Sequence, residues 1–202
     1  MRKNLTLLLF IESICHFKAS ADWDIASIQT VDNNCALSNL QVDDSKLSMR
    51  INGFTMSVGD IRTARGDASI ECKSQMSFLL PAHHRLGTFT HRVTARAAKD
   101  EHVELKMGVA INSDSTQFAF RGVLPFGTRF DDRVLLYKSF DARNLIDCSE
   151  SQQRLVLNFS WTLEVRKKDL AKTGFISMED GRALADTWLS TEECSLFSTE
   201  AR

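Results

Sequence analysis

The sequence predicts an all-β fold, an antiparallel β-sandwich of about 7–9 strands with one C-terminal α-helix. Apolar and polar residues alternate with a period of two along much of the chain, as in half-buried strands. Clusters of Asp, Asn and Ser separate these segments and indicate turns. Because no helical pattern lies between successive strands, a sandwich is favoured over an α/β sheet.

Three strands are expected in the first part of the chain, at residues 36–42, 46–54 and 69–80. In the second of them, three apolar residues alternate with polar ones. Pro81 ends the third, because proline cannot donate a hydrogen bond to a strand ladder. If these three strands form a meander, the starts of the first and the third lie beside the end of the second.

The remaining strands follow the same pattern. The clearest is Val103–Ile111, and the polar residues Asn112–Ser115 are expected to form a hairpin loop after it. The longest is Leu155–Val165. Shorter strands are expected at residues 89–95, 118–122 and 134–137.

One helix is expected at about residues 177–190. Ser177 followed by Asp180 resembles an N-cap with an acidic third position. Leu184 and Trp188 then stack on one helical face at the i, i+4 spacing. We expect this helix to pack over one end or edge of the sandwich.

The first 21 residues have the features of a secretory signal peptide. Arg2 and Lys3 precede the apolar run Leu5–Phe10, and Ala19-Ser20-Ala21 is the small-x-small pattern before a cleavage site. The run is too short to cross a bilayer. The sequence therefore predicts a secreted or periplasmic protein, residues 22–202, folded as one domain and without a membrane span after cleavage.

Charge argues against a nucleic-acid partner. Without the leader the chain carries 22 basic and 25 acidic residues, a net charge of −3. Domains that bind nucleic acids usually present a basic face.

Four cysteines remain after the leader is removed: Cys35, Cys72, Cys148 and Cys194. An even number in an oxidising compartment indicates two disulfides, and the absence of a C-x-x-C pair disfavours zinc. Four cysteines allow three connectivities. The meander places Cys35 and Cys72 at the same end of a sheet, which favours Cys35–Cys72. Cys148–Cys194 would then tie the C-terminal helix to the base of the last strand.

The order of these features resembles an uncharacterised secreted family of bacteria and fungi, domain of unknown function 4360. The matching features are Asn34-Cys35, the strand 46–54 that ends in Phe, Glu71-Cys72 before a strand ending at Pro81, Phe120-Arg121-Gly122, and Cys148 before the closing strand. They cover about residues 34–165. The chain departs from the family at Ala82-His83-His84, where glycine usually follows the proline, and at Ile146-Asp147, where an aromatic residue is usual. The resemblance implies the fold and secretion, and it implies no catalytic residue.

The histidine cluster does not predict a metal site. His83 and His84 are adjacent, and His91 follows on the next strand. A closed structural site needs four ligands. His91 shares a strand face with Phe89 and Val93, so an interior histidine is favoured, and we expect no metal and no cofactor.

Paired acids occur at Asp43-Asp44 and Asp131-Asp132. Adjacent side chains on an extended chain point apart, whereas glycosidases need two carboxylates that face one bond. Turn formation is the favoured explanation. Calcium binding by the loop 112–115 or by Asp131-Asp132 is an alternative, because oxygen-rich loops suit that ion.

Three further motifs concern modification and recognition. Asn158-Phe159-Ser160 is an N-glycosylation sequon on the polar face of its strand, and Asn158 would be modified in a eukaryotic host. Arg65-Gly66-Asp67 matches the tripeptide that integrins bind, but so short a match carries little weight. Trp23, Trp161 and Trp188 could stack on a sugar if exposed, although core positions are favoured for the last two.

The sequence favours a binding protein over an enzyme. It has no G-x-S-x-G elbow and no glycine-rich phosphate loop, and its mature cysteines are expected to be bridged. The leading hypothesis is a non-catalytic envelope or surface-interaction module. The alternative is a carbohydrate-binding module with a ligand loop around Phe126, Phe130, Asp131 and Asp132. The third is a small secreted hydrolase, which a buried carboxylate pair or a His–acid pair in a cleft would favour. The expected partner is a glycan or an envelope protein.

Overall fold

The computed structural model describes residues 23–31, 35–43, 45–58, 67–113, 116–169, 171–178 and 185–194. These residues form twelve strands and no helix. The strands are β1 (Asp24–Thr30), β2 (Ala36–Asp43), β3 (Lys46–Asn52), β4 (Thr55–Val58), β5 (Asp67–Leu80), β6 (His84–Lys99), β7 (Val103–Asn112), β8 (Gln117–Leu124), β9 (Phe130–Asp141), β10 (Gln153–Lys167), β11 (Gly174–Ser177) and β12 (Ala185–Glu193).

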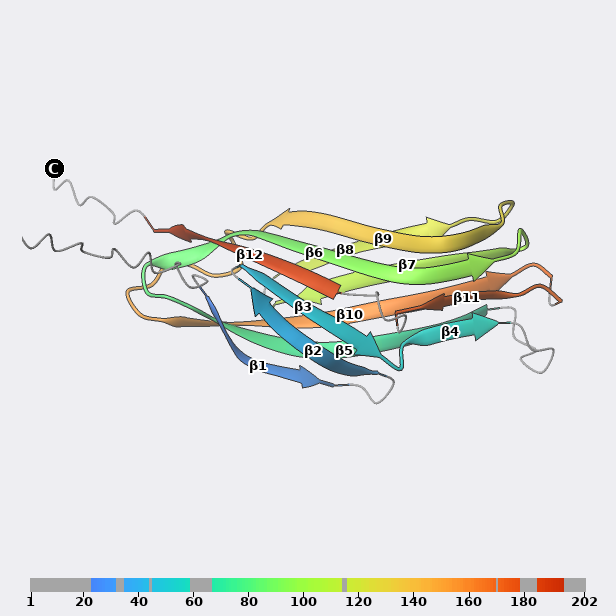
Figure 1. Cartoon of the computed structure of the whole chain (residues 1–202). Coiled ribbons are helices and arrows are strands. Elements are labelled where there is room, and N and C mark those ends of the chain that lie inside the picture. The colour runs from blue at the N-terminus through green and yellow to red at the C-terminus, as the bar shows by residue number, and fades with distance from the viewer. Residues whose placement is uncertain are drawn as a thin grey trace, which may run out of the picture.

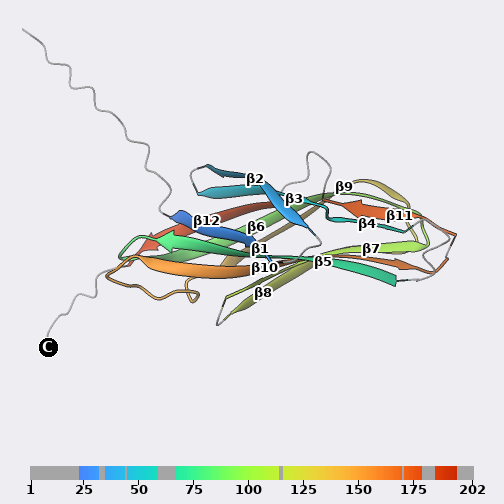
Figure 2. The same ribbon diagram turned by 90° about the horizontal axis from the view of Figure 1, so that it is seen from below.

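The strands form two antiparallel sheets, which confirms the predicted sandwich. The five-stranded sheet has the order β1-β5-β10-β7-β8. The seven-stranded sheet has the order β2-β3-β12-β6-β11-β4, and β9 pairs with β6. Figure 2 shows β2, β3 and β12 in one layer and β5, β10 and β8 in the other. In Figure 1, β4 and β11 lie side by side at the opposite end from the start of β6.

The predicted C-terminal helix is wrong. Residues 185–193 form strand β12, which pairs with β3 on one side and β6 on the other. The alternation that marks this strand includes Thr187 between Ala185 and Leu189, all three buried. A threonine on the core face made the period of two hard to recognise. Of the residues that suggested the helix, Asp180 and Leu184 lie outside the described residues.

More strands are present than the 7–9 expected. Strands β4 and β11 have four residues each, too few to show a period. Strand β1 carries no clean alternation in its sequence. The apolar run at 134–137 is the middle of the twelve-residue strand β9.

The three strands do not form the meander on which the disulfide prediction was based, although the favoured disulfides do form. Strands β2 and β3 pair, but β5 belongs to the other sheet. Cys35, just before β2, bonds to Cys72 in β5. Cys148 lies before β10 and bonds to Cys194 after β12. Both disulfides therefore join one sheet to the other, and neither joins two neighbouring strands of the same sheet.

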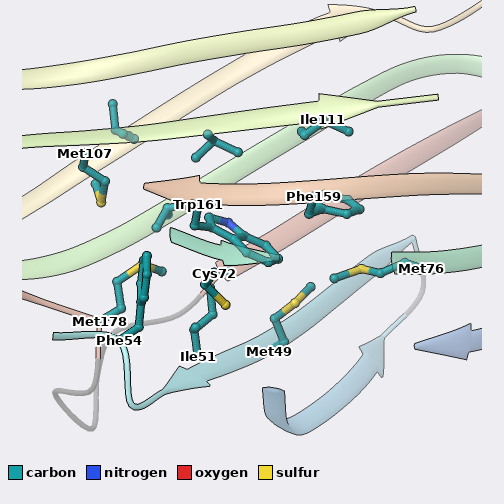
Figure 3. Close-up of a cluster of buried hydrophobic side chains, with 14 of the residues drawn as sticks. Met49, Ile51, Phe54, Cys72, Met76, Met107, Ile111, Phe159, Trp161 and Met178 are labelled. Carbon is teal, nitrogen blue, oxygen red and sulfur yellow. The ribbon is translucent and has the colours of Figure 1, made fainter. Parts of the chain in front are cut away.

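The core lies between the two sheets and is rich in sulfur (Figure 3). Trp161 of β10 is fully buried and lies opposite Cys72 of β5. Methionines from four segments also belong to this core, where flexible thioethers fill irregular spaces between larger side chains. They are Met49, Met76, Met107 and Met178.

His91 is an interior histidine, as the sequence predicts. Its ring is fully buried between the sheets. Trp161 Nε1 donates to His91 Nε2 at 3.1 Å, so this nitrogen is the acceptor. The proton then sits on Nδ1, which donates to Thr187 Oγ1 at 2.9 Å. Burial lowers the pKa of His91 to about 3, although the nearby Asp186 acts in the opposite direction.

The predicted signal peptide, residues 1–21, lies outside the described residues. Trp23, just after it, is buried and donates from Nε1 to the carbonyl oxygen of Leu189 at 3.2 Å. The same indole contacts Phe78 edge-on, with 5.6 Å between centroids. Strand β1 is thereby connected to the opposite sheet. In the described part of the chain, no helix meets the length and apolarity needed to cross a membrane.

Candidate functional site

A groove lies on the outer face of the seven-stranded sheet, at the end where β4 and β11 lie. One residue from each of four adjacent strands forms a row across its floor. Ser57 of β4 is opposite Phe175 of β11, which is opposite Ala98 of β6. Ala98 is opposite Asp131 of β9. The small side chain of Ala98 therefore leaves a depression between an aromatic and an acidic side chain.

The groove has a volume of about 640 Å³. Ligand sites in proteins typically have volumes of about 300–1,000 Å³. Three residues next to strand ends also line it: Asp100 follows β6, Arg129 precedes β9 and Thr173 precedes β11. Its lining residues are Ser57, Ala98, Lys99, Asp100, Arg129, Phe130, Asp131, Thr173, Gly174 and Phe175.

Two carboxylates in the groove are fixed by neighbouring groups. Asp131 pairs with the guanidinium of Arg96. Asp100 accepts hydrogen bonds from the backbone N–H of Thr173 at 3.1 Å and from its hydroxyl at 3.4 Å. The bond from the Thr173 amide is the main reason that the pKa of Asp100 lies below its ordinary value. Asp100 is thus an acceptor at neutral pH.

The loop that supplies Arg129 is attached to the sandwich by two polar contacts. Lys99 is buried, and its ammonium group donates to the carbonyl oxygen of Thr128. Burial lowers the pKa of Lys99, while Asp100 and Glu104 act to raise it. The N–H of Gly127 donates to the carbonyl of Glu101 at 2.7 Å. These contacts position the loop before a ligand binds.

Strand β11 approaches the opposite sheet closely beneath the groove. A Cβ on Gly174 would lie 2.8 Å from Cγ1 of Val103 in β7, closer than atoms can pack. Glycine is therefore needed at the start of β11, and it lets Phe175 take its place in the row.

The four residues of the predicted ligand loop fall in three places. Phe130 and Asp131 line the groove. Phe126 lines a neighbouring depression beside His102, and the ammonium of Lys168 lies 4.3 Å from its ring centroid. Asp132 points away from the groove, at the edge of β9, where its carboxylate accepts the backbone N–H of Arg133 at 2.7 Å.

Asn158 lies on the outer face of the five-stranded sheet, near its middle. It is half-buried, and its side-chain oxygen accepts a hydrogen bond from Gln75 at 3.0 Å. It belongs to a row of side-chain amides across all five strands. The row is Gln29, Gln75, Asn158, Asn112 and Gln117. Glycosylation of Asn158 stays a prediction.

The remaining candidate residues do not converge. His83 is exposed in a turn with φ of 60°, whereas His91 is in the core. Among the residues that the structure describes, no three His, Cys, Asp or Glu side chains are placed to hold a metal ion. Asp44, Asp114-Ser115 and Arg65-Gly66 lie outside the described residues.

Trp188 is on the same outer face as the groove, not in a helix. Lys46 and Arg92 lie over its ring at 5.5 and 5.0 Å from the centroid. They come from the strands on either side of β12, so the indole is flanked by two cations. Asp186, two residues before it, is buried and bonded to Ser48 and Arg92. Burial acts to raise the pKa of Asp186, but the hydrogen bonds from Ser48 and Arg92 outweigh it. The pKa of Asp186 therefore lies below its ordinary value.

The sequence did not indicate Phe175, Ala98 or Asp100 as site residues. Phe175 belongs to a four-residue strand without a readable period. Asp100 follows a long strand in a short charged run that resembles any solvated turn. What the sequence did indicate of this site is the pair Phe130 and Asp131, at the start of β9.

No protein-family model matches the chain, and no curated protein matches it. Among solved structures, the chain is similar to the module TmCBM61, solved in complex with β-1,4-galactotriose. The two share 8% identity over 84% of this chain and 88% of that one, with a TM-score of 0.29. A CBM4 structure shares 13% identity over 87% and 90% of the two chains, with a TM-score of 0.25. TM-scores this low do not establish a common fold.

Proposed function

We propose that the protein is an exported, non-catalytic binding module that takes a short saccharide in the groove beside Ala98. The observation that carries the proposal is the row Phe175–Ala98–Asp131, which puts an aromatic ring and a carboxylate on opposite sides of a depression. A sugar ring has apolar C–H faces and a rim of hydroxyls, so it needs both kinds of neighbour. The two disulfides join the sheets to each other, and neither contains a residue that lines the groove.

The polar groups of the groove suit hydroxyl groups as ligands. Asp131 and Asp100 accept hydrogen bonds, and Arg129 donates them. Hydrogen bonds to charged groups are stronger than those between neutral groups. The carboxylates are already bonded to Arg96 and Thr173, so their orientation does not have to be fixed on binding. Preorganised groups of this kind reduce the entropy lost on association.

Replacing Asp131 with alanine is expected to weaken saccharide binding by about 10-fold or more, because it removes a charged acceptor. Phe175→Ala should weaken it similarly through loss of the aromatic wall. Isothermal titration calorimetry with cellotriose, xylotriose, mannotriose and galactotriose measures the affinities. Asp132→Ala is the matched control, since Asp132 is the adjacent acid and points away from the groove.

Equal affinities of Asp131→Ala and Asp132→Ala would contradict the assigned groove. Silence of the wild-type protein on a broad glycan array would contradict the saccharide class. Turnover of any oligosaccharide that is lost in Asp131→Ala or Asp100→Asn would instead support the hydrolase alternative.

A further inference from the structure

One edge of strand β9 is not paired with any strand among the residues that the structure describes. Among the described residues it pairs with β6 alone, over the whole of its length from Phe130 to Asp141. In Figure 1 it forms the upper rim of the sandwich, with β6 alongside it. A long unpaired strand edge is a template for pairing with another chain. Two apolar side chains are exposed there, Leu135 at 61% and Tyr137 at 60%.

The backbone groups that face this edge can be assigned. The N–H of Ala142 donates to the carbonyl of Gly87 at 3.0 Å, just past the last pair of the β6–β9 ladder. Hydrogen-bonded pairs alternate along an antiparallel ladder, so the even-numbered residues of β9 bond to β6. The odd-numbered residues direct their N–H and C=O groups outward. In agreement, the N–H of Arg133 bonds to the Asp132 side chain and not to a strand.

We propose that β9 pairs antiparallel with β9 of a second copy of this chain, about a two-fold axis through Leu135. Leu135 is an odd-numbered residue, so two such residues can exchange both backbone hydrogen bonds across the axis. A two-fold contact brings each residue opposite its mirror position about the axis. The sequence of β9 fits this arrangement in both polarity and charge.

The charges of β9 are complementary about Leu135. Asp132 lies three residues before it and Lys138 three residues after, so each Asp132 faces the Lys138 of the second copy. Val134 likewise faces Leu136. Opposite charges and apolar pairs directly across an antiparallel ladder both stabilise the pairing.

Arg133 and Tyr137 also become partners, because each lies two residues from the axis. A guanidinium next to a tyrosine ring is a favourable contact. Leu135 lies opposite Leu135 of the second copy. The contact therefore covers the two exposed apolar side chains of the edge.

A register shifted along the strand loses this complementarity of charge and polarity. Moving the axis to Leu136 puts Asp131 opposite Asp141. Moving it to Val134 puts Asp132 opposite Leu136. Like charges and buried unpaired charges across a ladder are destabilising. Edge charges usually prevent pairing, but here they select one register.

Pairing at β9 joins the two seven-stranded sheets, and their outer faces lie on the same side. Asp131, in the wall of the groove, then faces Ser139 of the second copy. That serine hydroxyl is 2.8 Å from the hydroxyl of Thr90 on the neighbouring strand. The two grooves of the dimer would open in the same direction. The pairing itself does not depend on what the grooves bind.

A charge exchange tests the pairing. Wild-type protein at micromolar concentration is expected to sediment as a dimer, and Asp132→Lys is expected to weaken the dimer at least 10-fold by facing Lys138 with a second cation. Lys138→Asp should do the same. The double variant D132K/K138D restores opposite charges and should restore the dimer. Circular dichroism checks that each variant is folded, since both side chains are exposed.

A monomeric wild-type protein would overturn the proposal, and so would single variants that dimerise as well as the wild type. Failure of the double variant to recover the dimer would overturn the register. A cysteine at the axis provides a second test. Leu135→Cys is expected to form an intermolecular disulfide on mild oxidation, because facing Cα atoms lie about 5.5 Å apart. Ser139→Cys should not, since its two copies would be about 27 Å apart along the strands.

Discussion

Replacing both Cys35 and Cys72 with alanine is expected to lower the free energy of unfolding by more than about 4 kcal/mol. The bridge spans 37 residues, and closing a loop of that length restricts the unfolded chain by about 4 kcal/mol. Both sulfurs are also buried, Cys72 completely, so their loss removes packing next to Trp161. Urea unfolding followed by tryptophan fluorescence measures the change.

The second disulfide provides a matched control. Cys148–Cys194 spans 46 residues, so loop closure alone predicts a slightly larger contribution from it. Cys148 is exposed and Cys194 half-buried, so its removal leaves no cavity in the core. We expect the Cys35/Cys72 variant to be the less stable of the two despite its shorter loop. The reverse order would contradict the packing of the Cys35–Cys72 bridge between the sheets.

Acidification from pH 7 to pH 4.5 is expected to lower the free energy of unfolding by about 2–3 kcal/mol. The pKa of His91 is about 3 in the folded protein and 6.5 in its ordinary state. Between these values the unfolded chain binds a proton that the folded protein does not, so stability falls as pH falls. The pKa of Asp186 is lowered from 3.8 on folding, so its contribution is lost mainly below this interval. The pKa of Glu71 is lowered from 4.5, so Glu71 adds to the loss only at the acidic end of the interval.

His91→Gln separates the histidine from other titrating groups. Glutamine can accept from Trp161 and donate to Thr187, but it does not titrate. The variant should lose most of the dependence of stability on pH between 7 and 5, above the range in which carboxylates titrate, while unfolding in the same cooperative manner. An unchanged slope of stability against pH in His91→Gln would show that another group is responsible. Equilibrium urea unfolding at a series of pH values gives both slopes.

The sequence predicted the β-sandwich because its longest strands have one apolar and one polar face. Strand β7 has five buried residues alternating with half-buried ones, and its pattern is as clear in the sequence as in the structure. Strand β12 was misread because a core threonine interrupts the apolar face, and its hydroxyl is satisfied by His91 from another strand. That partner is 96 residues away, so no local pattern can reveal it.

The candidate site was only partly predictable. Phe130 and Asp131 were recognisable as an aromatic–acid pair near a loop. The depression exists because Ala98 lies between Phe175 and Asp131, and that depends on the register of three strands distant in sequence. Register is determined by packing of the whole sheet rather than by local sequence. The separation of Asp132 from Asp131 follows from alternation, as expected for adjacent side chains on an extended chain.

The most direct test of the proposed function is an NMR titration of isotopically labelled protein with the trisaccharide that binds best. The backbone amides of Ala98, Asp131 and Phe175 are expected to shift together and to saturate with one dissociation constant. Shifts confined to the amide row of the five-stranded sheet, or no saturable shift with any saccharide, would contradict the groove as the binding site.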